Sequence, residues 1–280
     1  HLSEALSERG YHLIILDNLS TGKQENIAAI LDKTNVEFIQ GSITDLPLLQ
    51  KLFKNVDYIF HLAAIASVPR SIEAPQECHE VNVTGTFNVL LAARDNKVKK
   101  VVNASSCAIY GDAPGLPKKE DMPINPLSPY AVAKLAAENY CQIFQKVYNL
   151  STVSLRYFNI FGPRQNPDSE YAAAIPRFIK IKSKGNTIHI YGDGQATRDY
   201  IYVKDAVAAF ILAAESEASG IYNIGSGKST TVNELVELIS KLTGDNTPPV
   251  YGPPRPGDIL HSLADASRAK TFGFRPGYSL

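Results

Sequence analysis

The segment Tyr11-His-Leu-Ile-Ile-Leu-Asp17 indicates the fold, because a short apolar run that closes on an acidic residue is typical of a buried parallel strand. Before it, residues 1–9 have the apolar spacing of a helix, and Gly10 ends them. Helix, strand and Asp17 match the second half of a dinucleotide-binding βαβ unit, whose acidic residue accepts hydrogen bonds from the adenosine ribose. The plainer alternative is that Asp17 only ends a strand.

The residues after this strand bear on the choice of cofactor. Asp17-Asn-Leu-Ser-Thr-Gly-Lys23 has no arginine directly after the acid. Because a carboxylate repels the 2′-phosphate of NADP, the segment favours NAD. The strand and Gly-rich turn that open a βαβ unit do not precede His1, so we expect a fragment that binds NAD less tightly without the amides of that turn.

Strands and helices alternate through the first half of the chain. This predicts an α/β fold, a Rossmann-type doubly wound parallel sheet with a smaller mixed α/β substrate-binding region. The expected domains are residues 1–156, which bind NAD, and residues 157–280, which mainly bind substrate and return segments to the first domain. Further strands are expected at 36–40, 58–62, 101–106 and 151–155, and helices at 80–96, 129–148, 203–215 and 232–242.

Two details of this scheme concern packing. The stripe Val83, Phe87, Leu90 and Leu91 is expected to be the buried face of helix 80–96, in which Asn82 is interpreted as a structural residue. Residues 159–167 and 252–258 are rich in Pro, Gly and Asn, so both are expected to be irregular chain.

Composition excludes several classes of partner. The 28 basic and 28 acidic residues give no net charge, so nucleic acid and anionic membranes are not expected as partners. No apolar run approaches the roughly 20 residues that span a bilayer, and no signal peptide is visible. The three cysteines have neither metal nor disulfide spacing, which predicts reduced thiols, no metal site and a cytoplasmic location.

Tyr130 and Lys134 lie one turn apart in a helix that is predicted to begin with Ser128 as its cap and Pro129 at its first position. The ammonium favours the phenolate, which brings a tyrosine of pKa about 10 closer to the range of a general base. An ordinary amphipathic surface has the same spacing, so this alternative stays open for the pair alone. Ser106 ends a predicted strand at the same edge of the sheet. Serines there are often turn formers, but the order strand, Ser, loop, Tyr-x-x-x-Lys favours catalysis.

These segments together resemble the extended short-chain dehydrogenase/reductase family, and within it the nucleotide-sugar 4-epimerases. The resemblance covers nearly the whole chain and rests on nine motifs in family order. They are Asp17-Asn-Leu-Ser-Thr-Gly22, His61-Leu-Ala-Ala64, Ser105-Ser-Cys-Ala-Ile-Tyr-Gly111, Tyr130-x-x-x-Lys134, Arg156-Tyr-Phe-Asn-Ile-Phe-Gly-Pro-Arg164, Tyr191-Gly-Asp-Gly194, Thr197-Arg-Asp199, Asn223-Ile-Gly225 and Arg255-Pro-Gly-Asp258.

The resemblance implies a role for each matching residue. Tyr130 would be the general base and acid on the sugar 4-hydroxyl, Ser106 would hydrogen-bond that oxygen, and Lys134 would bind the nicotinamide ribose. Further NAD contacts are implied for Asp17, Asn18, Ser20, Thr21, Gly22, Ser42, Ile43, Leu62, Ala63, Ala64, Ser105 and Tyr157, although the family often has an Asp where Ser42 stands. Implied contacts to a UDP-sugar are Ser67, Asn159, Ala173, Ala174, Tyr191, Arg198, Arg255, Asp258 and Ser262.

Two positions refine the implied reaction. Cys107-Ala108 follows Ser106, whereas dehydratases and decarboxylases of this family have an acidic residue there, so 4-epimerisation is favoured over elimination. Ser262 stands where strict glucose/galactose epimerases have a large aromatic wall, and a small side chain leaves room for an N-acetyl group. The resemblance is greatest to UDP-N-acetylglucosamine 4-epimerases. It implies UDP-GlcNAc/UDP-GalNAc as substrates, with UDP-Glc/UDP-Gal as a second pair, and a homodimer built on the helices near Glu80 and Pro129.

Alternatives remain open at this stage. One is a UDP-glucuronate 4-epimerase or another nucleotide-sugar dehydratase or decarboxylase. Another, from a different class, is an NAD-binding scaffold or sensor, against which the intact set Ser106, Tyr130 and Lys134 argues.

Overall fold

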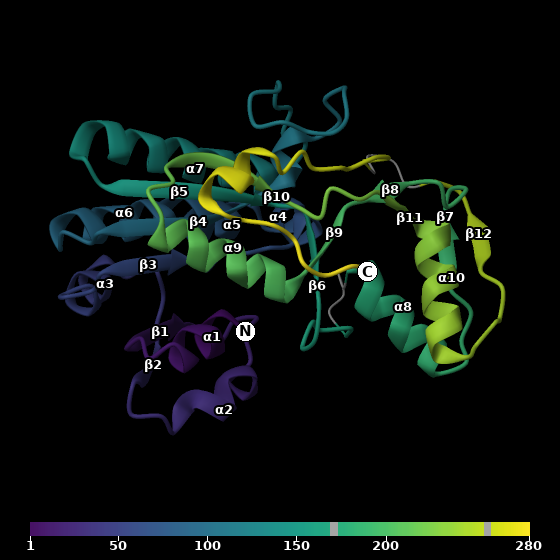
Figure 1. Cartoon of the computed structure of the whole chain (residues 1–280), viewed down its shortest axis with the longest axis horizontal. Coiled ribbons are helices and arrows are strands. Elements are labelled where there is room, and N and C mark those ends of the chain that lie inside the picture. Colours follow the sequence, from purple (N-terminus) through teal and green to yellow (C-terminus); the bar gives the residue numbers. More distant parts are fainter. Residues whose placement is uncertain (169–172, 255–258) are drawn as a thin grey trace.

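The computed structural model describes residues 1–168, 173–254 and 259–280 (Figure 1). Its main sheet has four parallel strands in the order β10-β5-β4-β3. They are β3 (Tyr58–His61), β4 (Lys100–Ser106), β5 (Ser151–Tyr157) and β10 (Gly220–Ile224). The parallel α/β fold is therefore confirmed.

A second, two-stranded sheet is formed by β1 (Leu13–Asp17) and β2 (Val36–Gln40). The pair is parallel and in register from Leu13 opposite Val36 to Asp17 opposite Gln40, so Asp17 lies at the carboxyl end of its strand. The surrounding helices are α1 (Leu2–Glu8), η1 (Gln24–Ile27), α2 (Ala28–Leu31) and α3 (Leu46–Leu52).

Helices cover both faces of the main sheet (Figure 1). On one face, α6 (Gly85–Asp95) and α7 (Pro129–Tyr148) pack with Val101 of β4. On the other face, α9 (Val203–Glu215) and η4 (Arg268–Phe272) pack with Val102. Because neighbouring strand residues point to opposite faces, a continuous apolar run such as Val101-Val102 supplies both cores.

Helix α7 begins and ends as its sequence predicts. The Ser128 hydroxyl accepts a hydrogen bond from the Ala131 amide at 3.2 Å, with Pro129 at the first position. The helix stops at Asn149, whose φ of 56° is left-handed. Asparagine tolerates this conformation better than most residues, so the stop is local in origin.

The expected helix 80–96 is not a continuous α-helix. A π-helical turn, η2 (Glu80–Thr84), precedes α6, and within it the Asn82 side chain pairs with both backbone groups of Ile65. Asn82 is therefore structural, as predicted. Of the expected stripe, Leu90 is fully buried, and Phe87 and Leu91 are partly buried and pack against the same core. Val83 is only half-buried. The fully buried positions are mostly small, among them Gly85, Ala92 and Ala93, and let the helix approach its neighbours closely.

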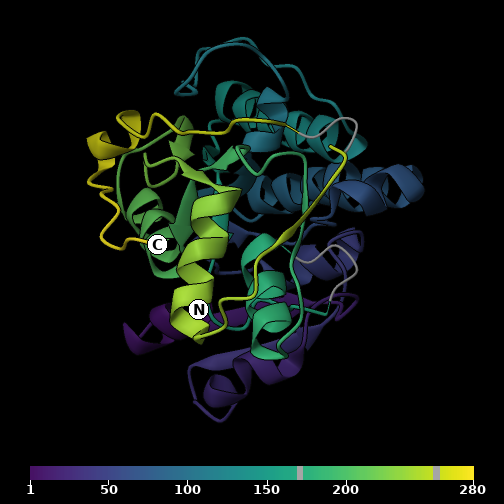
Figure 2. The ribbon, with the colours of Figure 1, turned by 90° about the vertical axis from the view of Figure 1, so that its right-hand side faces the viewer.

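The remaining elements form a smaller region in which α8 (Ala174–Ser183) and α10 (Val232–Thr243) lie side by side (Figure 2). Strand β6 (Asn159–Phe161) pairs with β9 (Tyr200–Tyr202), which corrects the prediction of irregular chain for residues 159–161. Two short strand pairs complete the region: β7 (His189–Tyr191) with β12 (Val250–Gly252), and β8 (Thr197–Arg198) with β11 (Thr230–Thr231). The helices α4 (Val68–Glu73) and α5 (Pro75–His79) lie beside α7 of the main sheet.

Within the described ranges, no helix has both the length and the apolar character that crossing a membrane requires.

Candidate active site

Ser106 ends β4, and the chain then turns through the 3₁₀ helix η3 (Cys107–Tyr110). The Ser106 hydroxyl accepts a hydrogen bond from the Ala108 amide at 3.2 Å, which fixes the start of the turn. At its end, Gly111 has φ +53°, and a Cβ there would lie 1.8 Å from the Asn125 carbonyl oxygen. Only glycine fits at this position, and the close contact with Asn125 fixes the backbone conformation of the turn that follows Ser106.

Tyr130 lies in the first turn of α7, where its backbone amide donates to the Ser71 hydroxyl at 3.1 Å. That hydroxyl in turn donates to the Val68 carbonyl at 2.6 Å, so α4 holds the start of α7. The Ser106 hydroxyl lies near enough to the Tyr130 phenol to act on its pKa, in the lowering direction. The structure therefore brings together the predicted base and its predicted serine partner.

Lys134 lies below Tyr130, with its Nζ 6.0 Å from the centre of the Tyr130 ring. Its ammonium donates to the Ala104 carbonyl at 2.8 Å, and burial lowers the pKa of Lys134 to about 8. Burial also raises the pKa of Tyr130, and the Ser106 hydroxyl acts in the lowering direction. We expected Lys134 to lower the Tyr130 pKa. Here Ser106 is the group that lowers it, because the ammonium is turned toward the backbone of β4.

Cys107 follows Ser106 and interacts with two predicted substrate residues, Ser262 and Arg198. Burial raises the pKa of its thiol to about 11, and the Ser262 hydroxyl and the charge of Arg198 act in the lowering direction. Arg198 donates to the Thr197 carbonyl at 2.9 Å and the Leu260 carbonyl at 3.3 Å. Ser262 and Arg198 therefore lie beside the residue that follows Ser106.

The backbone near Ser262 is fixed by hydrogen bonds to the side chain of Asp199, which is fully buried. Its carboxylate accepts hydrogen bonds from the amides of Ser226 at 2.7 Å, Gly227 at 3.0 Å and Ala264 at 3.1 Å, and from the Ser226 hydroxyl at 2.7 Å. The Ser262 amide donates to the Thr197 carbonyl at 3.1 Å. The main chain that carries Ser262 is thus fixed independently of its side chain.

Other predicted substrate residues lie on separate elements. Asn159 begins β6, where its amide donates to the Asp199 carbonyl at 3.0 Å. The Ser67 hydroxyl caps α4 by accepting from the Arg70 amide at 3.2 Å. Ala173 and Ala174 begin α8, and Tyr191 ends β7. Arg255 and Asp258 lie outside the described residues.

The predicted nucleotide contacts begin at the end of β1. One Asp17 oxygen accepts from the Leu19 amide at 2.7 Å, and Asn18 accepts from the Ser20 amide at 3.0 Å. The turn folds back so closely that a Cβ on Gly22 would lie 2.9 Å from the other Asp17 oxygen. Thr21 lies in the same turn. A carboxylate framed in this way fits the hydroxyls of a ribose.

A second group of predicted contacts follows β2 and β3. Ser42 and Thr44 share a hydroxyl hydrogen bond at 2.8 Å, whereas the Ile43 side chain is buried against Gly85 of α6. After β3, Leu62 is 47% exposed, and Ala63 and Ala64 follow it. Such a small apolar surface fits a flat ring.

Two predicted contacts have their hydroxyls engaged elsewhere. The Ser105 hydroxyl donates to Glu138 at 2.5 Å, and the Tyr157 hydroxyl donates to the Ala206 carbonyl of α9 at 3.1 Å. The Tyr157 ring packs on Phe210 in the core. Only their backbone groups remain for a cofactor.

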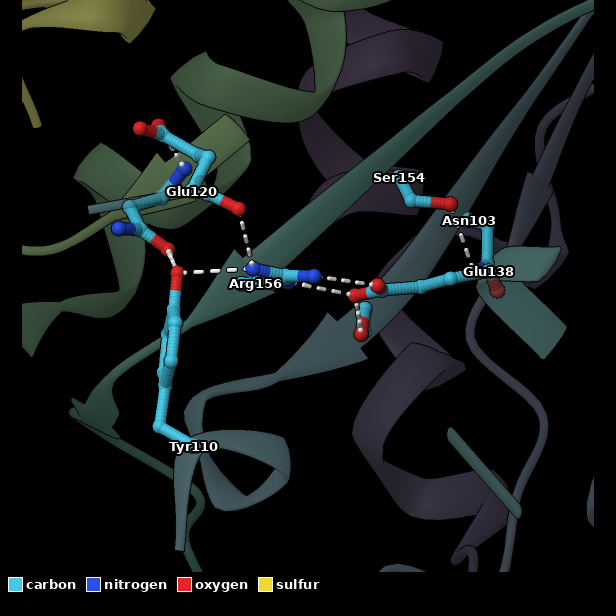
Figure 3. Close-up of polar contacts among 8 residues, drawn as sticks. Asn103, Tyr110, Glu120, Glu138, Ser154 and Arg156 are labelled. Atoms are coloured by element: carbon cyan, nitrogen blue, oxygen red, sulfur yellow. Dashed lines mark hydrogen bonds and ion pairs between the residues drawn. The ribbon is translucent and has the colours of Figure 1, made fainter. Parts of the chain in front are cut away.

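The structure also shows a buried network that the sequence did not reveal. Arg156 of β5 forms a two-point ion pair with Glu138 of α7, at 2.9 and 2.8 Å, and donates to the Tyr110 hydroxyl at 2.9 Å. Figure 3 shows Arg156 between these two partners. The available signal was position, since Glu138 lies one turn beyond Lys134 and two beyond Tyr130.

Comparisons with known proteins agree with this geometry. The model of the NAD dependent epimerase/dehydratase family matches residues 1–225. UDP-glucose 4-epimerase of Mycolicibacterium smegmatis is 38% identical over 283 residues, covering 100% of this chain and 90% of that protein. The structure of UDP-N-acetylglucosamine 4-epimerase from Methanobrevibacter ruminantium with UDP-N-acetylmuramic acid is 43% identical, with a TM-score of 0.96, covering 99% of this chain and 88% of that one. The Thermus thermophilus UDP-glucose 4-epimerase complex with NAD is 37% identical, with a TM-score of 0.90, covering 100% and 91%.

Proposed function

The chain belongs to the NAD dependent epimerase/dehydratase family as a UDP-sugar 4-epimerase, and on that premise we propose that it interconverts UDP-GlcNAc and UDP-GalNAc. The observation that carries the reaction type is the proximity of Ser106 to Tyr130, with Lys134 one turn farther along the same helix. An NAD-binding scaffold or sensor would not require these three side chains in mutual reach.

Each side chain has a defined task in the proposed reaction. When bound, NAD supplies the hydride acceptor and donor for C4 of the sugar. Tyr130 removes the proton of the 4-hydroxyl and returns it, while Ser106 holds the same oxygen. Asp17 would hold the adenosine ribose and Lys134 the nicotinamide ribose. Arg198 would bind the diphosphate through its guanidinium fork.

The residues after Ser106 favour epimerisation over elimination. Cys107 has a thiol whose pKa burial raises to about 11, and Ala108 has no titratable group. Elimination next to a 4-keto group needs a proton carrier, and neither residue supplies one at neutral pH. This observation disfavours a dehydratase or decarboxylase.

The choice of sugar rests on Ser262. It acts on the pKa of the Cys107 thiol, which places a small side chain near the residue that follows Ser106. A large aromatic residue there would occupy the space that an N-acetyl group needs. UDP-glucose and UDP-galactose are smaller, and we propose that they are also converted.

The test is an NMR product assay on the NAD-loaded enzyme with UDP-GlcNAc, UDP-glucose, UDP-glucuronate and dTDP-glucose. We expect UDP-GalNAc from UDP-GlcNAc, and we expect Ser262→Tyr to remove this activity while UDP-glucose is still converted. Ser262→Ala is the matched control and should keep both. Turnover of UDP-glucose with none of UDP-GlcNAc in the wild type would refute the substrate assignment, and a 4-keto-6-deoxy product would refute the reaction type.

We further propose a cytoplasmic homodimer. The three cysteines are free thiols, which suits a reducing compartment. Val132, Ile143 and Val147 of α7 are 53%, 50% and 59% exposed and recur at helical spacing along one stripe. An apolar stripe of this kind beside α6 suits pairing with a second copy.

Sedimentation tests the dimer. The wild type should sediment at twice the 30.5 kDa chain mass, and Ile143→Asp should yield monomers. Leu242→Asp on α10, which is 77% exposed, is the control and should remain dimeric. A monomeric wild type would overturn the proposal.

A further inference from the structure

The segment that carries Ser106 is anchored on both sides by one buried ion pair. On its amino side, the Ser105 hydroxyl donates to Oε1 of Glu138 at 2.5 Å. On its carboxyl side, Tyr110 accepts from Nη1 of Arg156 at 2.9 Å. Glu138 and Arg156 are bound to each other at two points and are 0% and 3% exposed, so water does not compete for these contacts.

The network continues beyond the ion pair. The Tyr110 hydroxyl donates to Asn223 of β10 at 2.7 Å, and the Asn223 amide donates to Glu120 at 2.7 Å. Glu120 also accepts from Arg156 through its backbone carbonyl at 3.2 Å. Figure 3 shows this chain of contacts running across the sheet from α7 to the loop of Glu120. Each group is bound on two or more sides, which leaves little freedom for any one to shift.

Charges at the site agree with this picture. Burial acts most strongly on the pKa of Arg156, in the lowering direction. The hydrogen bonds and charge interactions with Glu138 and Tyr110 together outweigh it and raise the pKa, so the guanidinium stays charged. Burial raises the pKa of Tyr110, which keeps its hydroxyl protonated and able to donate to Asn223. A buried ion pair adds little stability over a well-packed apolar replacement, so its clearest physical effect is to fix geometry.

We propose that Glu138, Arg156, Ser105 and Tyr110 are positioning residues that set the approach of Ser106 to Tyr130. The helix that carries Tyr130 also carries Glu138, two turns farther along. The ion pair therefore ties the serine segment to the same rigid helix as the base, and fixes the distance between the two hydroxyls. This inference rests on the proposed function of Ser106 and Tyr130.

Small substitutions can test the network without removing the ion pair. Ser105→Ala deletes only the bond to Glu138, and Tyr110→Phe deletes only the hydroxyl between Arg156 and Asn223. Thr152→Val is the matched control, because Thr152 is a buried residue of β5 whose hydroxyl donates to the Cys141 carbonyl of α7 at 2.9 Å, away from Ser106. Ser105→Ala loses one buried hydroxyl contact, whereas Tyr110→Phe and Thr152→Val each lose two, since the Thr152 hydroxyl also donates to Gln145 at 3.3 Å.

We expect Ser105→Ala and Tyr110→Phe to lower kcat about tenfold with KM nearly unchanged, since a displaced hydroxyl weakens the reaction step more than binding. The nearby Ser106 hydroxyl acts to lower the pKa of Tyr130, so the acidic limb of the kcat profile should move to higher pH in both variants. Cys107 and Cys78 also face Tyr130 and raise its pKa, and both are unchanged in all variants. Thr152→Val should keep the wild-type kcat and the wild-type position of the acidic limb.

A second measurement does not depend on the substrate. The tyrosinate absorbance of each NAD-loaded protein, minus that of its Tyr130→Phe counterpart, reports the ionisation of Tyr130 alone. We expect a higher pKa in Ser105→Ala and Tyr110→Phe than in the wild type or Thr152→Val. The inference would be overturned if the pKa of Tyr130 were unchanged in both Ser105→Ala and Tyr110→Phe, or if Thr152→Val raised it by the same amount. If the wild type epimerises no UDP-sugar, the proposed function fails and this titration alone decides the inference.

Discussion

Polar side chains at the two ends of the proposed NAD site find their partners at very different distances along the chain. Near Asp17, the bonds from Leu19 to Asp17, from Ser20 to Asn18 and between Ser42 and Thr44 each span two residues. Around Ser106, the bonds from Ser105 to Glu138, Arg156 to Tyr110 and Tyr110 to Asn223 span 33, 46 and 113 residues. The nucleotide end is therefore a set of local turns, whereas the catalytic end exists only once the whole sheet has assembled.

The difference separates two physical requirements. A turn that holds a ribose can form from its own residues and adjust when the ligand arrives. A proton transfer needs two groups held at fixed distance, and non-local contacts in a dry interior supply that rigidity. Substitutions at the catalytic end should therefore have larger effects than substitutions at the nucleotide end.

The largest expected effect is on chemistry. Tyr130→Phe should lower kcat by about 10²- to 10⁴-fold, the usual contribution of a general base, while the thermal midpoint stays unchanged. Tyr148→Phe at the exposed end of the same helix is the control. A kcat within tenfold of the wild type would remove Tyr130 from the mechanism.

The next effect contrasts a buried with an outlying ion pair. Glu138→Ala should cost about 3–5 kcal/mol of unfolding free energy, because it leaves the Arg156 charge buried without a partner. Arg164→Ala breaks the partly exposed pair with Glu4 of α1 and should cost about 0–1 kcal/mol. Urea unfolding measures both, and equal losses would contradict the contrast.

A pH effect should follow from His61 at the catalytic end. Burial lowers its pKa from 6.5 to about 3, and its ring is bound to the Thr86 hydroxyl at 2.8 Å. Between these values the unfolded chain binds the additional proton. Stability should therefore decrease as the pH falls from 6.5 toward 3, by up to about 1.4 kcal/mol per pH unit.

Urea unfolding at several pH values checks this against His61→Gln, which lacks the titrating ring. The difference in unfolding free energy between the two proteins should change with pH below 6.5 and be constant above it. A parallel pH dependence of the two proteins would show that His61 does not contribute.

The smallest expected effect lies at the nucleotide end. Asp17→Asn should weaken NAD binding by about 1 kcal/mol, roughly fivefold in Kd, because one hydrogen-bond acceptor loses its charge. Calorimetric titration measures it, with the exposed Asp32→Asn as control. A loss as large as a hundredfold would mean that this end is as rigidly constructed as the catalytic end.

The same contrast explains which features could be read from the sequence. Helix α7 follows from Ser128, Pro129 and Asn149, whose effects are local, and β2 was predicted at its observed bounds. Asp17, Ser106, Tyr130 and Lys134 were found because motif spacing and the ends of strands are also local signals. The structure places the last three together as expected.

The features that were missed depend on distant partners. Residues 159–161 form a strand because they pair with β9, which lies some forty residues later in the sequence. The π-turn at Asn82 depends on Ile65, and the burial of Arg156 on Glu138. Charged residues are normally predicted to be exposed, and the helical spacing of Glu138 from Lys134 does not by itself identify Arg156 as its partner.

The hydrogen bonds that the Asp199 carboxylate accepts, here called the Asp199 clamp, affect how the substrate selectivity of such a site can change during evolution. Because the carboxylate holds the amides of Ser226, Gly227 and Ala264, the segment carrying position 262 keeps its path whatever side chain stands there. A library of variants at position 262 should therefore be populated mainly by folded proteins that differ in selectivity. The clamp makes that position a natural entry point for directed evolution, and a gene duplicate could change its substrate there in a single step.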